Sequence, residues 1–303
     1  MIAQVAAVQL ANALKHIYIN PLERCNLNCQ ICYTRKTSPI LTSTQILDFV
    51  TAYQKVQKLE TITFCGGEVL ALANFPDLIN TLTQQSLFIQ VITNGTINVL
   101  KKIQHPNSVN FIVSIDGIEK LHDANRGLGN YQKSINFLRH AIKLGCHCEV
   151  FSIVHHQNLN LIDEFEIELK KELGVLPPIT YHPRKPPLYL ETHPVANILG
   201  QVTGFDFLTQ SEMLELMQTR RVFPSPELGC YQIAVASDGQ VYGCCEGTMP
   251  LGKMTESPAG LIAKLRQRLE SWSQTNEFQG CLGCSQPDFM CGIKPYLKKL
   301  PQK

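Results

Sequence analysis

The sequence predicts an α/β fold, a partial (β/α)6 TIM barrel followed by a small cysteine-rich domain. Short apolar, β-rich runs alternate with longer helical stretches from residue 16 onward, a pattern typical of a parallel sheet with covering helices. After the sixth of these runs the pattern breaks, in the proline-rich stretch "LPPITYHPRKPP", and continued regular sheet is not expected beyond it. Six of the 12 cysteines lie from residue 230 onward, which indicates a second domain supported by cysteine side chains.

The elements are predicted in chain order. The N-terminal stretch is expected to be a helix, because Gln4, Gln9, Asn12 and Lys15 fall in one polar sector of a helical wheel. This helix packs on its own domain, or else contacts a partner helix or a membrane surface. Six runs fit buried parallel strands, at residues 16–20, 61–64, 88–93, 110–116, 148–154 and 179–182. The helices between them are expected at 43–58, 74–85, 96–104, 130–144 and 158–173.

Three regions follow from this pattern. Residues 1–184 are the partial barrel with its N-terminal helix, residues 185–229 form a bridging segment, and residues 230–303 form the second domain. The second domain begins near "YQIAVASDGQVYGCC", which predicts a β-hairpin with its turn at Ser237-Asp238-Gly239. The functional residues of a parallel barrel lie at the C-terminal ends of its strands.

Charge and hydropathy exclude several classes of partner. The net charge of +2, without clustered Lys and Arg, argues against nucleic acid. No basic segment precedes the apolar N-terminus and no apolar run is long enough to cross a bilayer, so neither export nor a membrane location is predicted. The 12 cysteines are therefore expected to be reduced, in a cytoplasmic protein.

The stretch "ERCNLNCQICYT" directly after the first strand places Cys25, Cys29 and Cys32 in the spacing Cys-x3-Cys-x2-Cys. Grouped thiols in a reducing compartment indicate a metal site rather than cross-links. Zinc would need a fourth ligand. Three sulfurs suit a 4Fe-4S cluster with one iron open to an exogenous ligand.

A second motif is expected at the same edge of the sheet. "TFCGGEVL" ends the second strand and places Gly66, Gly67 and Glu68 beside the cysteine loop. Two glycines allow a ligand to approach the backbone closely, and the carboxylate can accept hydrogen bonds from an ammonium group. Cys65 is expected to be a buried thiol, with a position facing the substrate as the alternative.

Together these motifs resemble the radical S-adenosylmethionine (radical SAM) superfamily over residues 16–184. The resemblance implies that Cys25, Cys29 and Cys32 hold a catalytic 4Fe-4S cluster, whose open iron chelates S-adenosyl-L-methionine. It implies that Glu68 binds the methionine ammonium and that Tyr33 lies near the adenine. An electron from the cluster would cleave the cofactor to a 5′-deoxyadenosyl radical, which abstracts a substrate hydrogen atom. Val69 departs from the usual proline without removing a ligand.

Other segments are similar to the same superfamily. "VSIDG" resembles a ribose-contacting segment, with Ser114 and Asp116 on one side of the fourth strand. Thr93 and Asn94 reach the rim from the third strand. The resemblance further places Arg126 near the mouth of the barrel, and Ile153 and Val154 beside the adenine. Cys146 and Cys148 are expected to be structural.

The C-terminal cysteines resemble SPASM and twitch extensions, which carry auxiliary iron–sulfur clusters. A full SPASM set has two more cysteines than this chain offers, so the resemblance implies one auxiliary 4Fe-4S cluster, with zinc as the alternative. Its expected ligands are Cys230, Cys244, Cys281 and Cys284, with Cys291 or Cys245 as competitors. In sulfatase-maturating relatives an aspartate stands at the position of Cys245, so this thiol argues against that activity. It could instead return a hydrogen atom to a substrate radical.

The resemblance implies a radical SAM enzyme that modifies a ribosomally synthesised precursor peptide by epimerisation, cross-linking or backbone excision. The alternatives are dehydrogenation or rearrangement of a small molecule such as an amino sugar, and a non-catalytic iron–sulfur binding module. The implied partners are the precursor peptide and an external electron donor. Only about 15 residues precede the first strand, too few for a leader-binding module of roughly 80, so a separate small leader-recognition protein is expected.

Overall fold

The strands that the computed structural model describes form one sheet of nine, in the order β6-β5-β4-β3-β2-β1-β7-β8-β9. The structure describes residues 10–11, 13–32, 34–184, 202–220, 232–245 and 249–275. The first six strands are parallel to their neighbours, as predicted. They are β1 (His16–Ile19), β2 (Thr61–Phe64), β3 (Phe88–Thr93), β4 (Val109–Ser114), β5 (His147–Val154) and β6 (Ile179–Pro183).

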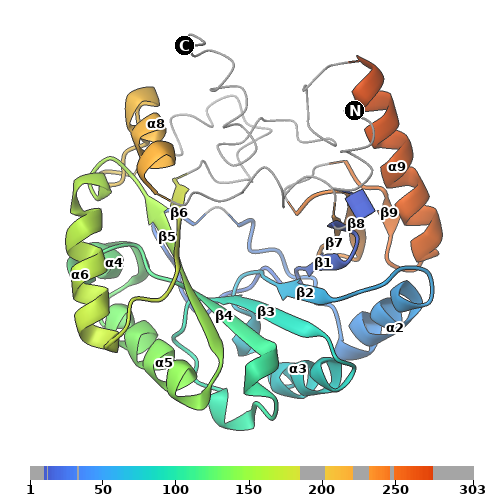
Figure 1. Ribbon diagram of the computed structural model, residues 1–303, viewed down its shortest axis with the longest axis horizontal. Helices are drawn as coiled ribbons and strands as arrows, with labels where there is room; N and C mark the ends of the chain where they lie inside the picture. Colours follow the sequence, from blue (N-terminus) through green and yellow to red (C-terminus); the bar gives the residue numbers. More distant parts are fainter. Residues whose placement is uncertain are drawn as a thin grey trace.

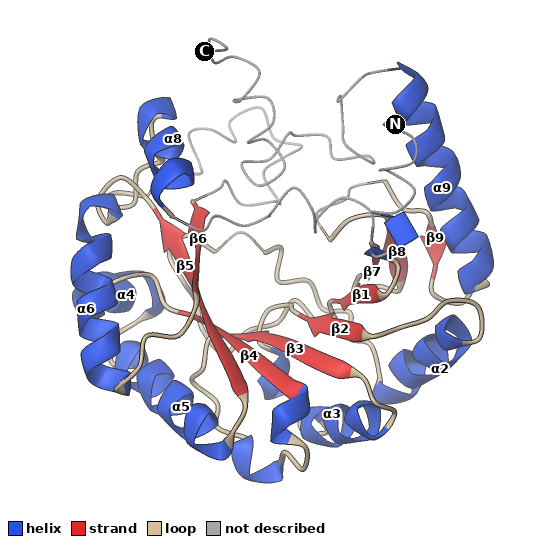
Figure 2. Ribbon diagram, in the orientation of Figure 1, coloured by secondary structure: helices blue, strands red, loops and turns tan. Residues whose placement is uncertain are grey.

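Helices line the convex face of this curved sheet (Figure 1). The helices that alternate with the strands are α2 (Ser43–Gln54), α3 (Phe75–Gln84), α4 (Glu119–Arg126), α5 (Asn130–Leu144) and α6 (Ile162–Leu173). Two more follow, α8 (Gln210–Thr219) and α9 (Pro258–Thr275), and α9 contacts α2. Single turns of 3-10 helix are η1 (Val69–Ala71), η2 (Leu100–Lys102), η3 (Pro106–Ser108) and η4 (Leu159–Leu161). The arrangement is an open barrel with its helices outside (Figure 2).

Local sequence sets the helix ends. Thr42 caps α2 through a reciprocal capping box with Gln45. Gly145 ends α5 at a φ of 89°, and Gly174 ends α6 at a φ of 75°, both in the left-handed region that glycine adopts without strain. These caps fix where each chain segment returns to the sheet.

The apolar core lies between the sheet and its helices. Ile62, Ile89 and Val150 are fully buried on the strand faces that contact the helices. The alternate positions face the barrel interior, where polar side chains from β1, β2 and β3 meet. There, the His16 ring bonds the Thr63 hydroxyl at 2.8 Å, and that hydroxyl donates to Gln90 at 2.7 Å.

Four of the five predicted barrel helices are confirmed as α2, α3, α5 and α6, whereas the helix expected at 96–104 is wrong. Only η2 (Leu100–Lys102) forms there, because the Asn98 side chain accepts the Leu100 N–H and so favours a turn over a helix. Helix α4 was not predicted, since its sequence "EKLHDANR" carries no apolar stripe. The predicted N-terminal helix lies mostly outside the described residues. No helix in the described residues is both long and apolar enough to span a membrane.

The predicted hairpin is confirmed, and it continues the barrel sheet. Strand β7 (Ile233–Val235) pairs in parallel with β1 and antiparallel with β8 (Gln240–Tyr242), which in turn pairs with β9 (Gly252–Lys253). Gly239 makes the turn at a φ of 80°. The predicted boundary at residue 230 therefore does not coincide with a break in the sheet.

Candidate functional site

Three thiols gather at the edge where the parallel strands end. Cys25, Cys29 and Cys32 lie on the loop after β1, are partly buried and form no disulfide. Burial, reinforced by the nearby Asp116 and by Cys32 and Cys25, raises the pKa of Cys29 to about 11 against the opposing charge of Arg126. Burial likewise raises the pKa of Cys25. Ligand binding at this loop would therefore release protons from the thiols.

The thiols are gathered without meeting at a single point. In the described part of the chain, no three His, Cys, Asp or Glu side chains converge as the ligands of one metal ion do. An iron–sulfur cluster binds cysteine thiolates at different irons, so its ligands are spread over the cluster faces. Cys32 interacts electrostatically with both Cys25 and Cys29, so the three thiols lie near one another on the loop.

The two glycines after β2 pack against the backbone of the cysteine loop. A Cβ at Gly66 would lie 2.2 Å from the Leu22 carbonyl oxygen, and one at Gly67 would lie 2.0 Å from that of Arg24. The Gly67 N–H donates to the Leu22 oxygen, and the Glu68 N–H to the Arg24 oxygen, each at 2.9 Å. The sequence pointed to close approach by a ligand, whereas here the close approach is made by the loop itself.

We expect Gly67→Ala to lower the free energy of unfolding by about 1 to 3 kcal/mol, the usual cost of forcing a methyl group into a packed site. The methyl would collide with backbone atoms, which cannot rotate away. Gly260→Ala is the matched control, because a Cβ there meets nothing within 4 Å and the residue lies in α9. Urea unfolding compares the two, and a Gly67→Ala protein as stable as the wild type would contradict the packing role.

Glu68 is fully buried and joins the β2 edge to the β3 edge. One carboxylate oxygen accepts the Leu70 N–H at 3.0 Å and the Thr93 hydroxyl at 2.8 Å, and the other accepts the Asn94 N–H at 2.8 Å. Burial raises the pKa of Glu68, and these three bonds oppose that shift. A carboxylate can accept about four hydrogen bonds, so one acceptor position is left for the ammonium group assigned to it from sequence.

Asn94 connects the β3 edge to the first cysteine of the loop. Its Nδ2 donates to Asn26 Oδ1 at 2.9 Å and lies 3.7 Å from Cys25 Sγ. Its Oδ1 accepts from both the N–H and the hydroxyl of Thr96, at 2.9 and 2.6 Å. Since Asn26 also donates to Thr96 at 2.8 Å, the loop near Cys25 is held by a closed set of hydrogen bonds.

A buried ion pair supports the other side of the cysteine loop. Asp116, 1% exposed, accepts from Arg126 Nε at 2.6 Å and Nη2 at 3.1 Å, from Asn125 Nδ2 at 2.7 Å and from the Ile153 N–H at 3.1 Å. Burial acts to raise the pKa of Asp116, but the Arg126 guanidinium outweighs it and the pKa falls below its ordinary value. Both carboxylate oxygens are filled, so Asp116 orients its neighbours rather than reaching a ribose.

Arg126 brings the ion pair to the cysteines. Its side chain is 13% exposed, and its charge interacts with both Cys29 and Cys32. Its Nη1 has no hydrogen-bond partner among the described residues, which leaves one edge of the guanidinium for a ligand. Beside it, burial and the Arg126 charge lower the pKa of His122 to about 4, so this ring is neutral at pH 7 and accepts the Asp116 N–H.

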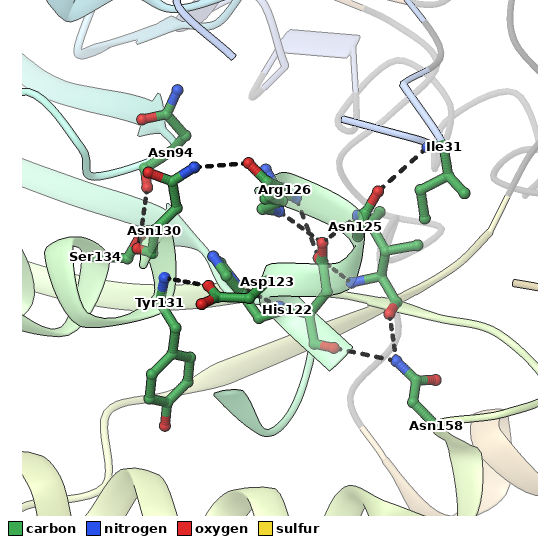
Figure 3. A network of polar contacts seen from close by, with 12 residues as sticks. Ile31, Asn94, His122, Asp123, Asn125, Arg126, Asn130, Tyr131, Ser134 and Asn158 are labelled. Atoms are coloured by element: carbon green, nitrogen blue, oxygen red, sulfur yellow. Dashed lines mark hydrogen bonds and ion pairs between the residues drawn. The ribbon is translucent and has the colours of Figure 1, made fainter. Parts of the chain in front are cut away.

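Sequence reasoning missed Asn125, whose side chain and carbonyl contact the cysteine loop in the network that Figure 3 shows. Its position beside Arg126 in "HDANRG" was the available hint, but a helical asparagine gives no specific pattern. The place of Ile153 and Val154 beside the adenine stays a prediction, although the two side chains lie on different faces of β5. Adjacent strand residues point to opposite faces, and Val154 is 1% exposed in the core. Ile153 and Ser114 remain at the end of the barrel where the cysteines lie.

The remaining predicted residues divide between described and undescribed parts of the chain. Cys65 is 8% exposed, as expected of a buried thiol, and Cys146 is likewise 8% exposed. Cys244 is buried and Cys245 partly exposed, directly after β8. The other predicted ligands and the adenine neighbour lie outside the described residues, namely Tyr33, Cys230, Cys281, Cys284 and Cys291.

Comparisons with known proteins agree with this geometry. Two curated relatives match short segments. The sporulation killing factor maturation protein SkfB of Bacillus subtilis (strain 168) is 26% identical over 121 residues, which cover 38% of this chain and 30% of SkfB. A 7,8-dihydro-6-hydroxymethylpterin dimethyltransferase of Methanocaldococcus jannaschii is 31% identical over 112 residues, 34% of this chain and 22% of that protein. The chain thus matches less than a third of either relative.

The fold is shared over much more of the chain. The structure of anSMEcpe with bound AdoMet superposes with a TM-score of 0.67 at 17% identity, over 93% of this chain and 96% of that one. Streptococcus suis SuiB bound to precursor peptide SuiA gives a TM-score of 0.64 at 12% identity, over 85% and 67% of the two chains. The model of the Radical SAM superfamily matches residues 19–166, which include the three loop cysteines, Glu68, Asp116 and Arg126. Over these residues the chain is therefore similar to the radical SAM superfamily.

Proposed function

We propose that this chain is a radical SAM enzyme that modifies a peptide. The observation that carries the proposal is the gathering of Cys25, Cys29 and Cys32 beside the Asp116–Arg126 pair at the C-terminal edge of the sheet. The three thiolates would hold a 4Fe-4S cluster with one iron left open. When bound, the cluster would supply the electron that cleaves S-adenosyl-L-methionine and so generates the 5′-deoxyadenosyl radical.

The chain's own residues would bind and orient the cofactor. The available edge of Arg126 suits the methionine carboxylate, since Asp116 holds the guanidinium in a fixed plane. The remaining acceptor position on Glu68 suits the methionine ammonium. Ser114 and Ile153 lie at the same end of the barrel, where they would contact the nucleoside. Arg126 would thus pair with the negative charge of the methionine moiety, and Glu68 with its positive charge.

A peptide substrate is supported by one curated relative and by two solved structures. SkfB is a maturation protein, SuiB has been solved with its precursor peptide, and anSMEcpe has been solved with a Cp18Cys peptide. The methyltransferase relative, named for a pterin, supports a small-molecule substrate instead, but the match spans only 22% of it. Transfer of deuterium from a labelled precursor peptide into 5′-deoxyadenosine would separate the two.

Cys245 is the proposed hydrogen donor if the reaction is epimerisation, with cross-linking and backbone excision as the other candidate reactions. Cys244 is buried and Cys245 partly exposed, so the two adjacent thiols differ in access. That difference fits Cys244 as an auxiliary-cluster ligand, together with Cys230, Cys281 and Cys284, and Cys245 as a reactive group. A separate leader-recognition protein and an external electron donor complete the proposal.

Anaerobically purified protein is expected to hold about eight irons, from two 4Fe-4S clusters. Replacing Cys230 and Cys244 by alanine should remove about half of them and leave the barrel cluster, because both cysteines flank one hairpin. Iron and acid-labile sulfide analysis, with zinc measured in parallel, provides the check. About four irons and one zinc in the wild type would contradict a second cluster.

The function itself is tested by reducing the reconstituted protein with S-adenosyl-L-methionine and measuring 5′-deoxyadenosine. We expect cofactor cleavage even without a peptide, at a slow uncoupled rate. A protein that binds a cluster at the loop but forms no 5′-deoxyadenosine under any reductant would favour the non-catalytic binding module.

A further inference from the structure

One side chain of α4 holds the segment between the second and third loop cysteines. Asn125 is 3% exposed, and its Oδ1 accepts the Ile31 N–H at 3.2 Å. Its backbone carbonyl accepts the N–H of Gln30 at 2.9 Å. One residue thus binds two consecutive amides, both lying between Cys29 and Cys32. Figure 3 shows Asn125 extending from the helix toward Ile31.

The opposite end of the Asn125 side chain is fixed as well. Its Nδ2 donates to Asp116 Oδ2 at 2.7 Å, and Asp116 also accepts the Ile153 N–H and two guanidinium bonds from Arg126. The amide can satisfy both neighbours in only one orientation. Reversal would place its NH2 group against the Ile31 N–H and its oxygen against a carboxylate. The side chain is therefore locked between the loop and the ion pair.

We propose that Asn125 is a positioning residue that holds Cys29 and Cys32 in the arrangement that binds the cluster, an inference that rests on the proposed function. Asn125 touches no cysteine and would act only through the backbone of Gln30 and Ile31. Ile31 is 8% exposed, so without Asn125 its N–H would be buried without its acceptor. The loop would then adopt other conformations. Binding of the cluster would have to order the loop, so the cluster would bind less tightly.

The hydrogen bonds are tested first by amide hydrogen exchange of the reconstituted full-length protein. Asn125→Ala should speed exchange of the Ile31 amide by roughly tenfold, the effect of losing one buried hydrogen bond. Asn130→Ala is the matched control. Asn130 is 6% exposed and donates to the Arg126 carbonyl in the neighbouring turn, but forms no hydrogen bond with the cysteine loop among the described residues. It should leave exchange at Ile31 unchanged.

The positioning role is tested by iron release to a chelator. The iron held by the cysteine loop, called loop iron here, is the fraction that is lost when Cys25, Cys29 and Cys32 are all replaced by alanine. Asn125→Ala should release that fraction roughly tenfold faster than the wild type and leave other iron at its original rate, while Asn130→Ala should match the wild type.

Asn125→Asp provides a readout that a general loss of stability would not give. The introduced carboxyl group is close in shape to the amide, and when protonated it can donate to Asp116 and accept from Ile31. Burial and the charge of Asp116, with which the new carboxyl group would share the single cation of Arg126, should raise its pKa above the ordinary value. Iron release from this variant should therefore be near the wild-type rate at about pH 6 and approach the Asn125→Ala rate at about pH 9, as the group ionises and repels Asp116.

Each outcome decides between the two proposals. Wild-type protein that holds loop iron, together with an Asn125→Ala variant that releases it at the wild-type rate, overturns the positioning role alone. An Asn125→Asp variant that releases loop iron at the wild-type rate at every pH overturns it as well. Wild-type protein without any iron bound by Cys25, Cys29 and Cys32 overturns the proposed function, and the inference from Asn125 with it.

Discussion

Replacing Cys25, Cys29 and Cys32 together by alanine is expected to abolish formation of 5′-deoxyadenosine and to remove about half of the bound iron. The three thiols are the ones that the structure gathers at the end of the parallel strands, beside the cation of Arg126. The barrel should still fold, because backbone hydrogen bonds from Gly67 and Glu68 to the loop do not involve the thiols. Circular dichroism and thermal unfolding would show whether the triple variant is folded like the wild type. A folded variant would mean that activity is lost through the missing cluster and not through unfolding.

A matched control is available within the same chain. Cys146 and Cys148 lie at the start of β5, the opposite edge of the sheet from the cysteine loop, and burial raises the pKa of Cys146 to about 11 and that of Cys148 to about 12. The double alanine variant should keep all iron and full cofactor cleavage. Cleavage by the triple variant at the wild-type rate, or equal iron loss in the control, would refute the assignment of the catalytic cluster.

The strands were predictable because a buried parallel strand can be recognised from its own residues. Each of the six runs is short, apolar and β-rich, and the observed bounds equal the predicted ones for β2 and β3 and differ by about one or two residues for the others. Helix α5 was placed at its observed bounds, since Gly129 and Gly145 delimit it. The failed helix at 96–104 shows the limit of such reasoning. A single side-chain bond from Asn98 decided the local structure there.

The sequence predicted which residues lie at the site better than it predicted what each of them contacts. The cysteine spacing and the Gly-Gly-Glu motif follow adjacent strands, so topology alone brings them together. What each group contacts depends on packing across the barrel. Residues 31 and 125 are 94 positions apart in sequence, so no local sequence pattern predicts the hydrogen bond between them. The same holds for Asp116, whose oxygens are filled by residues from α4 and β5.

The largest loss of stability is expected at the buried ion pair. Asp116→Ala should lower the free energy of unfolding by about 3 to 5 kcal/mol, the usual cost of breaking a buried pair by removing one partner. The Arg126 charge would be left without its counter-ion, and the Asn125 side chain and the Ile153 N–H would lose their acceptor. Asp48→Asn is the control, because that residue is exposed on α2 and its change should stay within about 0.5 kcal/mol.

The pH dependence of this effect carries a definite sign. Because the pKa of Asp116 is lower in the folded protein than its ordinary 3.8, the folded state binds this proton less readily than the unfolded chain. The carboxylate therefore contributes its full stability above about pH 4 and loses it as the pH falls through the folded-state pKa. Asp116→Asn keeps one acceptor oxygen but cannot ionise, so it should be less stable than the wild type at neutral pH, and the difference should shrink steadily below about pH 4. Urea unfolding of both proteins from about pH 7 down to pH 3 measures that difference. A constant difference over the whole range would mean that Asp116 stabilises the fold through shape alone, and that its charge is not what holds Arg126 beside the cysteines.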